Sequence, residues 1–325
     1  MTDSGHTWAI VLAAGDGSRL QSLTTTSVGV AVPKQFCSLH GGPSLLHDAL
    51  RRAESIAPPE RICTIVAKQH RRWWEDVLNV LPDRNVIVQP HNRGTGIGIL
   101  LPLLRIMMLD LDARVVLLPS DHHVRDEAVL ASALRTAVTT IETRPDRVVV
   151  LGMTPDEPDP ELGYIVPGAS RGNGIATVDR FVEKPSAQLA QSLVAEGALW
   201  NAFIVAAHAR TLLRMFTARI PHIVADMRAA VEHDANHSED PVAVRNLYEH
   251  LDTIDFSRHV MQGAESMLDV LSIAHCGWSD LGTPRRVAET LRRSPQRAPA
   301  RDRSSTALTG VLSLAVQQAH SPARG

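Results

Sequence analysis

Short apolar runs alternate with longer amphipathic stretches through the first half of the chain. The short runs are nearly continuous in Val, Ile, Leu and Ala, a pattern typical of strands buried on both faces of a sheet. They occupy residues 8–14, 61–67, 85–89, 114–119 and 147–153. Between them apolar residues recur three or four positions apart, which predicts helices at 44–56, 71–81, 96–109 and 126–142. This alternation favours an α/β fold with a doubly wound, mostly parallel sheet that binds ligands at the carboxyl ends of its strands.

The second half of the chain has a different pattern. Strand-like segments at 163–166, 176–182, 199–206 and 269–273 surround a helical block at 208–250. We therefore expect a core at residues 6–160 and a smaller lobe at 161–291 that completes the sheet. Residues 292–325 are rich in Arg, Pro and Ser, which predicts a flexible tail.

The composition excludes several classes of protein. Of 325 residues, 33 are Lys or Arg and 35 are Asp or Glu, so the formal charge of −2 provides no positive field for nucleic acid. A basic and aromatic stretch at 68–74 runs straight into two acids, which favours a helix start with a half-buried tryptophan. The longest apolar stretch, 97–109, is too short to cross a membrane. Scattered cysteines and the lack of a signal-like leader predict a soluble, cytoplasmic protein.

A glycine-containing loop directly follows the first predicted strand. Gly15-Asp16-Gly17-Ser18-Arg19 could cradle a phosphate, because glycines allow close backbone approach and a following helix start adds positive potential. A dinucleotide site needs a third glycine where Leu20 stands and an acid farther on, and residues 18–46 contain no acid. The P-loop pattern is missing too. A tight turn that requires glycine is the alternative interpretation.

Two cations accompany this loop. Arg19 lies in it, and Lys34 follows within Pro33-Lys34-Gln35-Phe36. Taken with the strand before it, AIVLAAGDGSRLQSLT followed by VPKQF resembles the signature of sugar-1-phosphate nucleotidyltransferases. Within that family the chain is most similar to the mannose-1-phosphate guanylyltransferases, also called GDP-mannose pyrophosphorylases.

Six further segments resemble segments of the family and follow its order. They are QPHNRGT at 89–95, PSDH at 119–122, LGYI at 162–165, FVEKP at 181–185, LWNAF at 199–203 and GWSDLGT at 277–283. The resemblance implies a Rossmann-like nucleotidyltransferase fold, with a nucleotide-binding core and a smaller sugar-phosphate-binding lobe. Residues 24–32 and Leu162 depart from the common guanylyltransferase pattern, which leaves the choice of sugar open.

The resemblance also assigns the residues that bind the nucleotide. Arg19 and Lys34 would be the catalytic cations that neutralise its phosphates. The nucleotide-binding residues would be Ala13, Ala14, Gly15, Gly17, Arg19, Lys34, Gln89, Asn92, Gly94 and Thr95. The segment at 89–95 is closer to the guanylyltransferase version than to the uridylyl or thymidylyl versions, which favours GTP.

Two aspartates are candidates for a Mg²⁺ site. Asp121 ends a buried strand, where a carboxylate is unfavourable unless it is paired or binds a cation. Asp280, in a loop flanked by glycines, could complete an oxygen site for a cation that bridges nucleotide phosphates. A helix N-cap or a turn is the alternative for Asp121. His122 and His123 are adjacent and their side chains diverge, which disfavours a zinc site on both.

The sugar phosphate would bind to the second half of the chain. By resemblance, its residues are Gly163, Tyr164, Glu183, Lys184 and Asn201. Glu183 and Lys184 alternate along a strand, so both enter one cavity only if the backbone bends there. Asn201 is a polar amide in an apolar strand, and sugar hydroxyls could satisfy it. Tyr164 offers either a ring face for the sugar or a core side chain.

These assignments predict transfer of a nucleotidyl group from GTP to mannose 1-phosphate, with GDP-mannose and pyrophosphate as products. The partners would be a nucleoside triphosphate and a sugar 1-phosphate, with Mg²⁺ as cofactor and without nucleic acid or membrane. Another triphosphate or sugar, or a non-catalytic regulatory paralogue, are the alternatives. A glycosyltransferase would need a D-x-D motif, whereas Asp121 precedes two histidines. A homodimer is left open.

Overall fold

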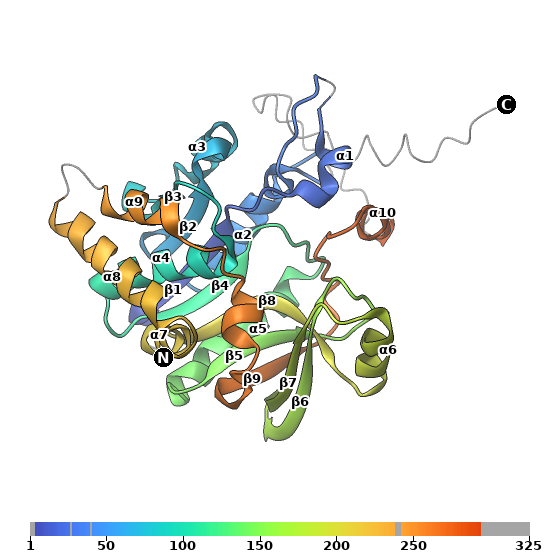
Figure 1. Ribbon diagram of the computed structural model, residues 1–325. Coiled ribbons are helices and arrows are strands. Elements are labelled where there is room, and N and C mark those ends of the chain that lie inside the picture. Colours follow the sequence, from blue (N-terminus) through green and yellow to red (C-terminus); the bar gives the residue numbers. More distant parts are fainter. Residues whose placement is uncertain (1–3, 27, 40, 238–241, 294–325) are drawn as a thin grey trace.

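The computed structural model describes residues 4–26, 28–39, 41–237 and 242–293 (Figure 1). Its strands are β1 (Thr7–Ala13), β2 (Ile62–Ala67), β3 (Val86–Gln89), β4 (Arg114–Pro119), β5 (Val148–Met153), β6 (Gly163–Gly172), β7 (Ile175–Glu183), β8 (Leu199–His208) and β9 (Leu268–Ile273). Its α-helices are α1 (Gln21–Thr24), α2 (Leu45–Glu54), α3 (Arg71–Leu78), α4 (Gly94–Leu109), α5 (Glu127–Thr143), α6 (Ala187–Ala195), α7 (Ala209–Arg219), α8 (Pro221–Asn236), α9 (Ala243–His250) and α10 (Pro284–Arg293). The α/β class predicted from the sequence is confirmed.

The hydrophobic pattern located most elements correctly. Each apolar run of the first half forms a strand, β1 to β5, and the amphipathic stretches between them form α2 to α5. The helical block of the second half is α7 to α9. The helix start predicted at 68–74 is confirmed, because α3 begins at Arg71 and Trp73 is half-buried; the next residue, Trp74, is buried, and its Nε1 donates to the carbonyl of Ala67 at 2.9 Å. Helices α6 and α10 were not expected.

The sheet is mixed, which corrects the expectation of a mostly parallel sheet. Nine strands are ordered β3-β2-β1-β4-β8-β5-β9-β7-β6. The pairs of β1 with β2 and β4, of β2 with β3 and of β5 with β9 are parallel. Strand β8 lies antiparallel between β4 and β5, and β7 is antiparallel to β6 and β9. A strand buried on both faces has the same composition in either direction, so the sequence pattern could not orient β8.

The second half of the sheet curls on itself. Strand β6 pairs with β8 at Tyr164–Trp200 and Ile165–Leu199, in addition to its pairing with β7. Strands β8, β5, β9, β7 and β6 thereby form a closed, barrel-like ring. The strands of the predicted lobe are continuous with those of the predicted core, and the division of the chain at residue 160 stays a prediction.

Apolar layers cover both faces of the sheet. Successive residues of β1 point to opposite layers, with Val11 in the layer that contains α2 and α5 and Ile10 in the layer that contains α4 and α7. Helices α7 and α8, from the second half, pack against α4 from the first half (Figure 1). The two halves therefore share one core, which fixes the loops at the ends of the central strands.

Two further expectations concern membrane spans and the C-terminal tail. The described part of the chain contains no helix that is long and apolar enough to span a bilayer. The predicted tail lies outside the described residues, apart from Arg292 and Arg293, which form the last residues of α10.

Candidate active site

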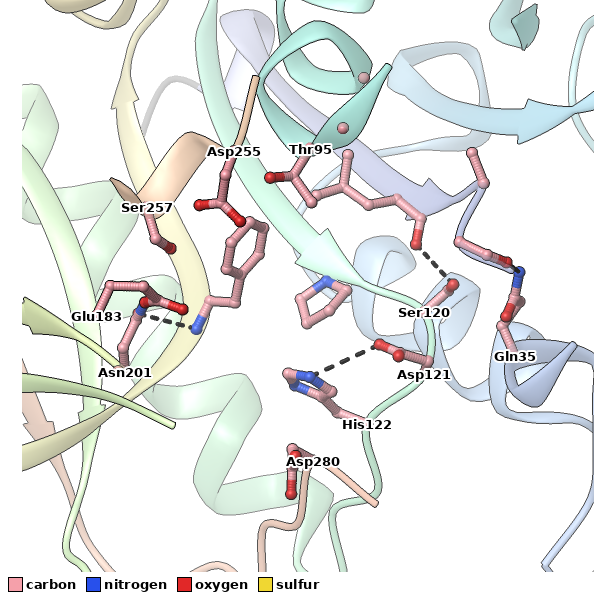
Figure 2. Close-up of a pocket in the computed structure, with 18 of the residues that line it drawn as sticks. Gln35, Thr95, Ser120, Asp121, His122, Glu183, Asn201, Asp255, Ser257 and Asp280 are labelled. Atoms are coloured by element: carbon pink, nitrogen blue, oxygen red, sulfur yellow. Dashed lines mark hydrogen bonds and ion pairs between the residues drawn. The ribbon is translucent and has the colours of Figure 1, made fainter. Parts of the chain in front are cut away.

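A cavity of about 420 Å³ lies at the carboxyl ends of β1, β3, β4 and β7, where ligands were expected (Figure 2). Residues from both halves of the chain line it. The predicted residues in the lining are Ala14, Gly15, Arg19, Gln89, Asn92, Gly94, Thr95, Asp121, Gly163, Glu183, Lys184, Asn201 and Asp280. Ala13, Gly17, Lys34 and Tyr164 are not in the lining. The fold thus gathers segments that lie far apart in the sequence.

The glycine loop is held in place by the segment that contains Lys34. Gln35 Nε2 donates to the carbonyls of Ala13 and Gly15 at 3.1 and 2.8 Å. Gly17 has φ +62°, and a Cβ on it would lie 2.9 Å from the backbone nitrogen of Lys34. Glycine is therefore required at position 17 by both conformation and space. This packing joins the two halves of the first family signature.

The helix expected after this loop is short. Residues Ser18–Leu20 form a 3₁₀ turn and α1 has four residues, so the contribution of a helix dipole to anion binding is smaller than the sequence suggested. Positive charge at the rim comes instead from Arg19, whose guanidinium is half exposed and lies 3.3 Å from Glu161.

Lys34 lies beneath the cavity and connects two of its loops. Its ammonium lies 2.9 Å from Asp121 Oδ2 and donates to the backbone carbonyl of Asp280 at 2.6 Å. The side chain of Lys34 is 7% exposed. Desolvation opposes the ionisation of Asp121, but the charge of Lys34, together with His122, holds the pKa of this carboxyl below its usual value. Asp121 is therefore a carboxylate at neutral pH.

His122 lies between the two aspartates as a neutral side chain. Burial lowers the pKa of His122 to about 4, although the charge of Asp121 opposes this. Trp278 Nε1 donates to His122 Nδ1 at 3.3 Å, which places the imidazole proton on Nε2, 3.6 Å from Asp121 Oδ1. Figure 2 shows the imidazole turned toward Asp121, with Asp280 on its other side.

Asp280 is held by an arginine of α10. Arg286 Nη1 lies 3.3 Å from Asp280 Oδ1, and Arg286 also binds Asp159 Oδ2 through Nε and Nη2 at 2.9 and 2.7 Å. The same guanidinium lies over the ring of Trp200, 4.6 Å from its centroid. The helix that the sequence analysis missed thus positions a predicted site residue.

The two aspartates fit Mg²⁺ when a substrate supplies further ligands. Asp121 Oδ2 pairs with Lys34 and Asp280 Oδ1 with Arg286, so the candidate ligand atoms are Asp280 Oδ2 and Asp121 Oδ1, the latter 3.6 Å from His122 Nε2. Within the described residues no group of three or more His, Cys, Asp or Glu could hold a metal ion. Magnesium commonly takes one or two carboxylates and completes its shell with phosphate and water.

The opposite end of the cavity carries Glu183 and Lys184. Strand β7 ends at Glu183, and Lys184 has φ +49°, the bend needed for both side chains to line the cavity. Burial and the nearby charge of Asp255 raise the pKa of Glu183 to about 7. A Cβ on Gly163 would lie 2.6 Å from Glu183 Oε2, so glycine at this position leaves room for the carboxyl.

Two predicted side chains at this end are partly or wholly satisfied by the protein. Asn201 Oδ1 accepts from the backbone nitrogen of Phe203 at 3.0 Å, and its amide nitrogen is left for a ligand. Tyr164 is fully buried, and its hydroxyl bonds the backbone of Asp159 at 2.8 and 3.1 Å. The expectation of a Tyr164 ring face for the sugar is wrong, because the ring belongs to the core.

The sequence analysis missed the segment after α9. Thr253, Asp255 and Ser257 line the cavity, and Figure 2 shows Asp255 and Ser257 on the same side as Glu183 and Asn201. In the sequence these residues lie in a stretch of mostly polar residues, 252–259, that is interrupted only by Ile254 and Phe256, so nothing distinguishes them. No motif marks them.

The same segment holds the loop that contains Gly94 and Thr95. Gly96 N donates to the carbonyl of Ile254 at 2.7 Å, and Phe256 N donates to Thr95 Oγ1 at 2.9 Å. A Cβ on Gly94, which has φ +81°, would lie 2.4 Å from the carbonyl oxygen of Ile254. Glycine is therefore required where the two segments meet.

Gln89 ends β3 inside the cavity. Its side chain is buried, and Oε1 has no hydrogen-bond partner among the described residues. A buried acceptor without a partner is unfavourable, so this oxygen is suited to a donor group of a ligand.

Comparison with known proteins identifies the family to which the chain belongs. The model of the family described as "Nucleotidyl transferase" matches residues 8–296. The chain belongs to the nucleotidyl transferase family. This match covers both ends of the cavity and every predicted site residue.

Several relatives are more specific in name. The xanthan biosynthesis protein XanB of Xanthomonas campestris pv. campestris is 34% identical over 197 residues, which are 59% of this chain and 40% of that protein. A putative mannose-1-phosphate guanylyltransferase of Vibrio cholerae is 27% identical over 84% of this chain and 58% of that protein. The chain spans about half the length of the curated relatives it matches.

Solved structures support the fold. A structure from Thermus thermophilus, titled mannose-1-phosphate geranyltransferase, superposes with a TM-score of 0.75 at 27% identity, over 90% of this chain and 81% of that one. A UDP-glucose pyrophosphorylase has a TM-score of 0.56 at 13% identity over 88% of this chain and 97% of that one, which supports the fold alone.

Proposed function

We propose that this protein is a sugar-1-phosphate nucleotidyltransferase, with GTP and mannose 1-phosphate as the best candidate substrates. A phosphate oxygen of the sugar 1-phosphate would attack the α-phosphorus of the triphosphate, and pyrophosphate would leave. The attacking oxygen is already anionic, so no general base is needed. Positioning of the two substrates and neutralisation of phosphate charge would supply the catalysis.

The observation that carries the proposal is the division of one cavity into two chemically different ends. The glycine loop with Arg19, whose guanidinium pairs with Glu161, forms a half-exposed end, and Glu183 with Asp255 forms an acidic, half-buried end. A triphosphate suits the first end and sugar hydroxyls suit the second. Lys34, beneath the cavity, pairs with Asp121, which lines it.

At the nucleotide end, Arg19 and the backbone of the glycine loop would bind the β- and γ-phosphates. Lys34 would add positive charge below the reacting phosphates and hold Asp121 in place. Asp121 and Asp280 would bind Mg²⁺, which when present neutralises charge on the triphosphate. Gln89 Oε1 would accept a hydrogen bond from the base, and guanine presents donors of that kind.

At the sugar end, Lys184 would contact the phosphate of the sugar 1-phosphate. Glu183 and Asn201 would bind sugar hydroxyls. The charge of Asp255 would help to keep the pKa of Glu183 raised, at about 7. The relatives named mannose-1-phosphate guanylyltransferase support mannose as the sugar.

The test is a matrix of ATP, CTP, GTP, UTP and dTTP against mannose 1-phosphate, glucose 1-phosphate and N-acetylglucosamine 1-phosphate. Pyrophosphate release is measured with Mg²⁺ and with a chelator. We expect the highest kcat/KM for GTP with mannose 1-phosphate, and loss of activity with the chelator. A higher value for another pair would correct the substrates and keep the reaction.

Two variants test the residues. Asp121→Asn should lower kcat about 10²- to 10³-fold, the usual effect of removing one electrostatic group from a reaction centre. Asp83→Asn, on an exposed 3₁₀ turn, is the matched control and should behave as the wild type. Pyrophosphate release from no substrate pair would overturn the proposal in favour of a non-catalytic nucleotide-sugar-binding paralogue.

A further inference from the structure

A second concave surface lies away from the reaction cavity. It is a groove of about 510 Å³ that is lined by residues of α5 and of the turn that joins β6 to β7. Three arginines and five Ser or Thr residues contribute to its lining, and no acid does. None of its lining residues lines the reaction cavity. The groove is therefore a separate candidate site with a positive and hydroxyl-rich surface.

The groove carries more positive charge than the one buried acid beneath it, Asp269, neutralises. Asp269, which is fully buried, lies 2.8 Å from Arg147 Nη2, 3.1 Å from Arg171 Nε and 3.6 Å from Arg144 Nη1. One carboxylate thus faces three guanidinium groups. Arg135, one turn earlier on α5 than Thr139, has no ion-pair partner within the described part of the chain. A dianion in the groove would balance this excess.

The arginines are also positioned to bind an anion. Asp269 bonds Arg171 through Nε, which leaves the two terminal nitrogens of that guanidinium as donors. Arg144 lines the groove with a side chain that is 38% exposed, while its Nη1 lies 3.6 Å from Asp269 Oδ2. Because guanidinium groups fixed by a buried acid lose little freedom on binding, they are well suited to the oxygens of a phosphate.

The hydroxyl groups on α5 complement the arginines. Thr136 donates to the carbonyl of Ser132 at 3.0 Å, and Thr140 donates to that of Thr136 at 2.7 Å. Thr143 donates to the carbonyl of Thr140 at 3.0 Å. With their protons used inside the helix, these hydroxyl oxygens remain as acceptors, which suit the hydroxyls of a sugar and not a phosphate. Threonine is also a weak helix former, so helix stability does not explain the repeated threonines of α5.

We propose that the groove binds a phosphorylated sugar, with the phosphate on Arg135, Arg144 and Arg171 and the sugar hydroxyls on the threonines of α5. The volume lies within the range of small-molecule sites. A nucleic acid is disfavoured, because the whole chain has a net charge of −2. The proposal does not rest on the reaction proposed above.

The test is calorimetric titration of the full chain with three probes: inorganic phosphate, glucose 6-phosphate and glucose. Glucose 6-phosphate carries no phosphate at the anomeric carbon, so it is not a substrate of the proposed reaction. We expect it to bind more tightly than inorganic phosphate, and glucose alone not to bind. Arg135→Ala and Arg144→Gln should each weaken its binding about tenfold, the usual effect of losing a charged hydrogen bond. Thr136→Val should reduce its affinity to that of inorganic phosphate.

Two controls separate this site from the reaction cavity. Arg228→Ala removes one positive charge from the exposed surface of α8 and should leave binding unchanged. Lys34→Met, which alters the reaction cavity, should also leave it unchanged, whereas pyrophosphate release by Arg135→Ala should match the wild type. Absence of binding to the wild-type chain would overturn the proposal. So would binding that is lost in Lys34→Met and retained in Arg135→Ala.

Discussion

The two ends of the reaction cavity are built in different ways. At the nucleotide end the loop is shaped by backbone contacts, because Gln35 bonds two carbonyls of the loop and Gly17 allows Lys34 to approach. At the sugar end the shape depends on side chains, above all the half-buried Glu183, which lies close to Gly163. A loop fixed by its backbone suits phosphates, which any well-placed N–H or cation can bind, whereas half-buried acids suit the directional hydroxyls of one sugar.

The two ends also differ in how their charges are controlled. Arg19 is half exposed, so water screens its pair with Glu161. Glu183 is half-buried near Asp255, and partial burial together with the charge of Asp255 raises its pKa to about 7. The charge at the sugar end therefore changes near neutral pH. The predictions below test this contrast, from the largest expected effect to the smallest.

Replacement of Lys34 should have the largest effect, because Lys34 contacts both candidate Mg²⁺ ligands, Asp121 and Asp280. Lys34→Met leaves the Asp121 carboxylate without its cation and the carbonyl of Asp280 without its donor. We expect kcat for pyrophosphate release to fall about 10²- to 10³-fold. Lys68→Met, at an exposed lysine, is the matched control and should retain wild-type kcat. Wild-type turnover by Lys34→Met would contradict a role for Lys34 in holding Asp121 and Asp280 in place.

A methyl group at Gly163 should affect the sugar end alone. Its Cβ would lie 2.6 Å from Glu183 Oε2, so Gly163→Ala must displace the carboxyl. We expect KM for the sugar 1-phosphate to rise about tenfold, with KM for the triphosphate unchanged. Gly42→Ala adds a methyl group where no atom lies within 4 Å, and serves as the control. Equal increases in both KM values would mean that the two ends are not independent.

Acidification should weaken sugar binding. Because the pKa of Glu183 is about 7, the carboxyl becomes protonated below that pH and accepts hydrogen bonds less well. We expect KM for the sugar 1-phosphate to rise severalfold as the pH falls from about 8 to about 6. The substrate phosphate titrates in the same range, so the measurement is the difference between the wild type and Glu183→Gln. Asp255→Asn should move the midpoint to lower pH.

The Glu183 carboxyl should also make the free energy of unfolding depend on pH. Its pKa is raised from 4.5 to about 7, so between these values the folded state binds a proton more tightly than the unfolded state does. The contribution of Glu183 to the free energy of unfolding should therefore fall as the pH rises from 4.5 to 7. Urea unfolding should show this slope in the wild type, and a smaller one in Glu183→Gln.

Release of Arg19 from its partner should have the smallest effect. The pair of Arg19 with Glu161 is exposed on both sides and is worth about 0 to 1 kcal/mol. Glu161→Gln should change KM for the triphosphate less than about twofold. It should change the free energy of unfolding by less than about 1 kcal/mol. A large change in either would show that the nucleotide end depends on side-chain pairing as much as the sugar end does.

The sequence located most of the fold because buried strands and amphipathic helices have distinct periods. The runs that became β1 to β5 needed no tertiary information. Helix α6 was missed because it is short and lies between two strands, and α10 because its many arginines resemble the start of a tail. Its arginine, Arg286, is buried and neutralised by Asp159 and Asp280, a pairing that no local pattern reveals.

The sequence predicted some residues of the candidate site and missed others, again because local patterns do not show long-range contacts. Segments with glycines and charged residues in a fixed order, such as those that contain Gly17 and Lys184, could be matched one by one. Asp255 and Ser257 lie in no such segment, and they enter the cavity only because Ile254 bonds to Gly96. Tyr164 lies in a matched segment, but its neighbours in space made it a core residue.

By itself the sequence determined the α/β class, the strands of the first half and the local chemistry of the family segments, because each depends on the periodicity or order of nearby residues. Tertiary structure alone decided the direction of β8, the closure of the ring through β6, and the meeting of Glu183 with Asp255. Those features depend on contacts between residues far apart in the chain. Burial and charge at such contacts are set by packing, and the composition of a segment does not encode them.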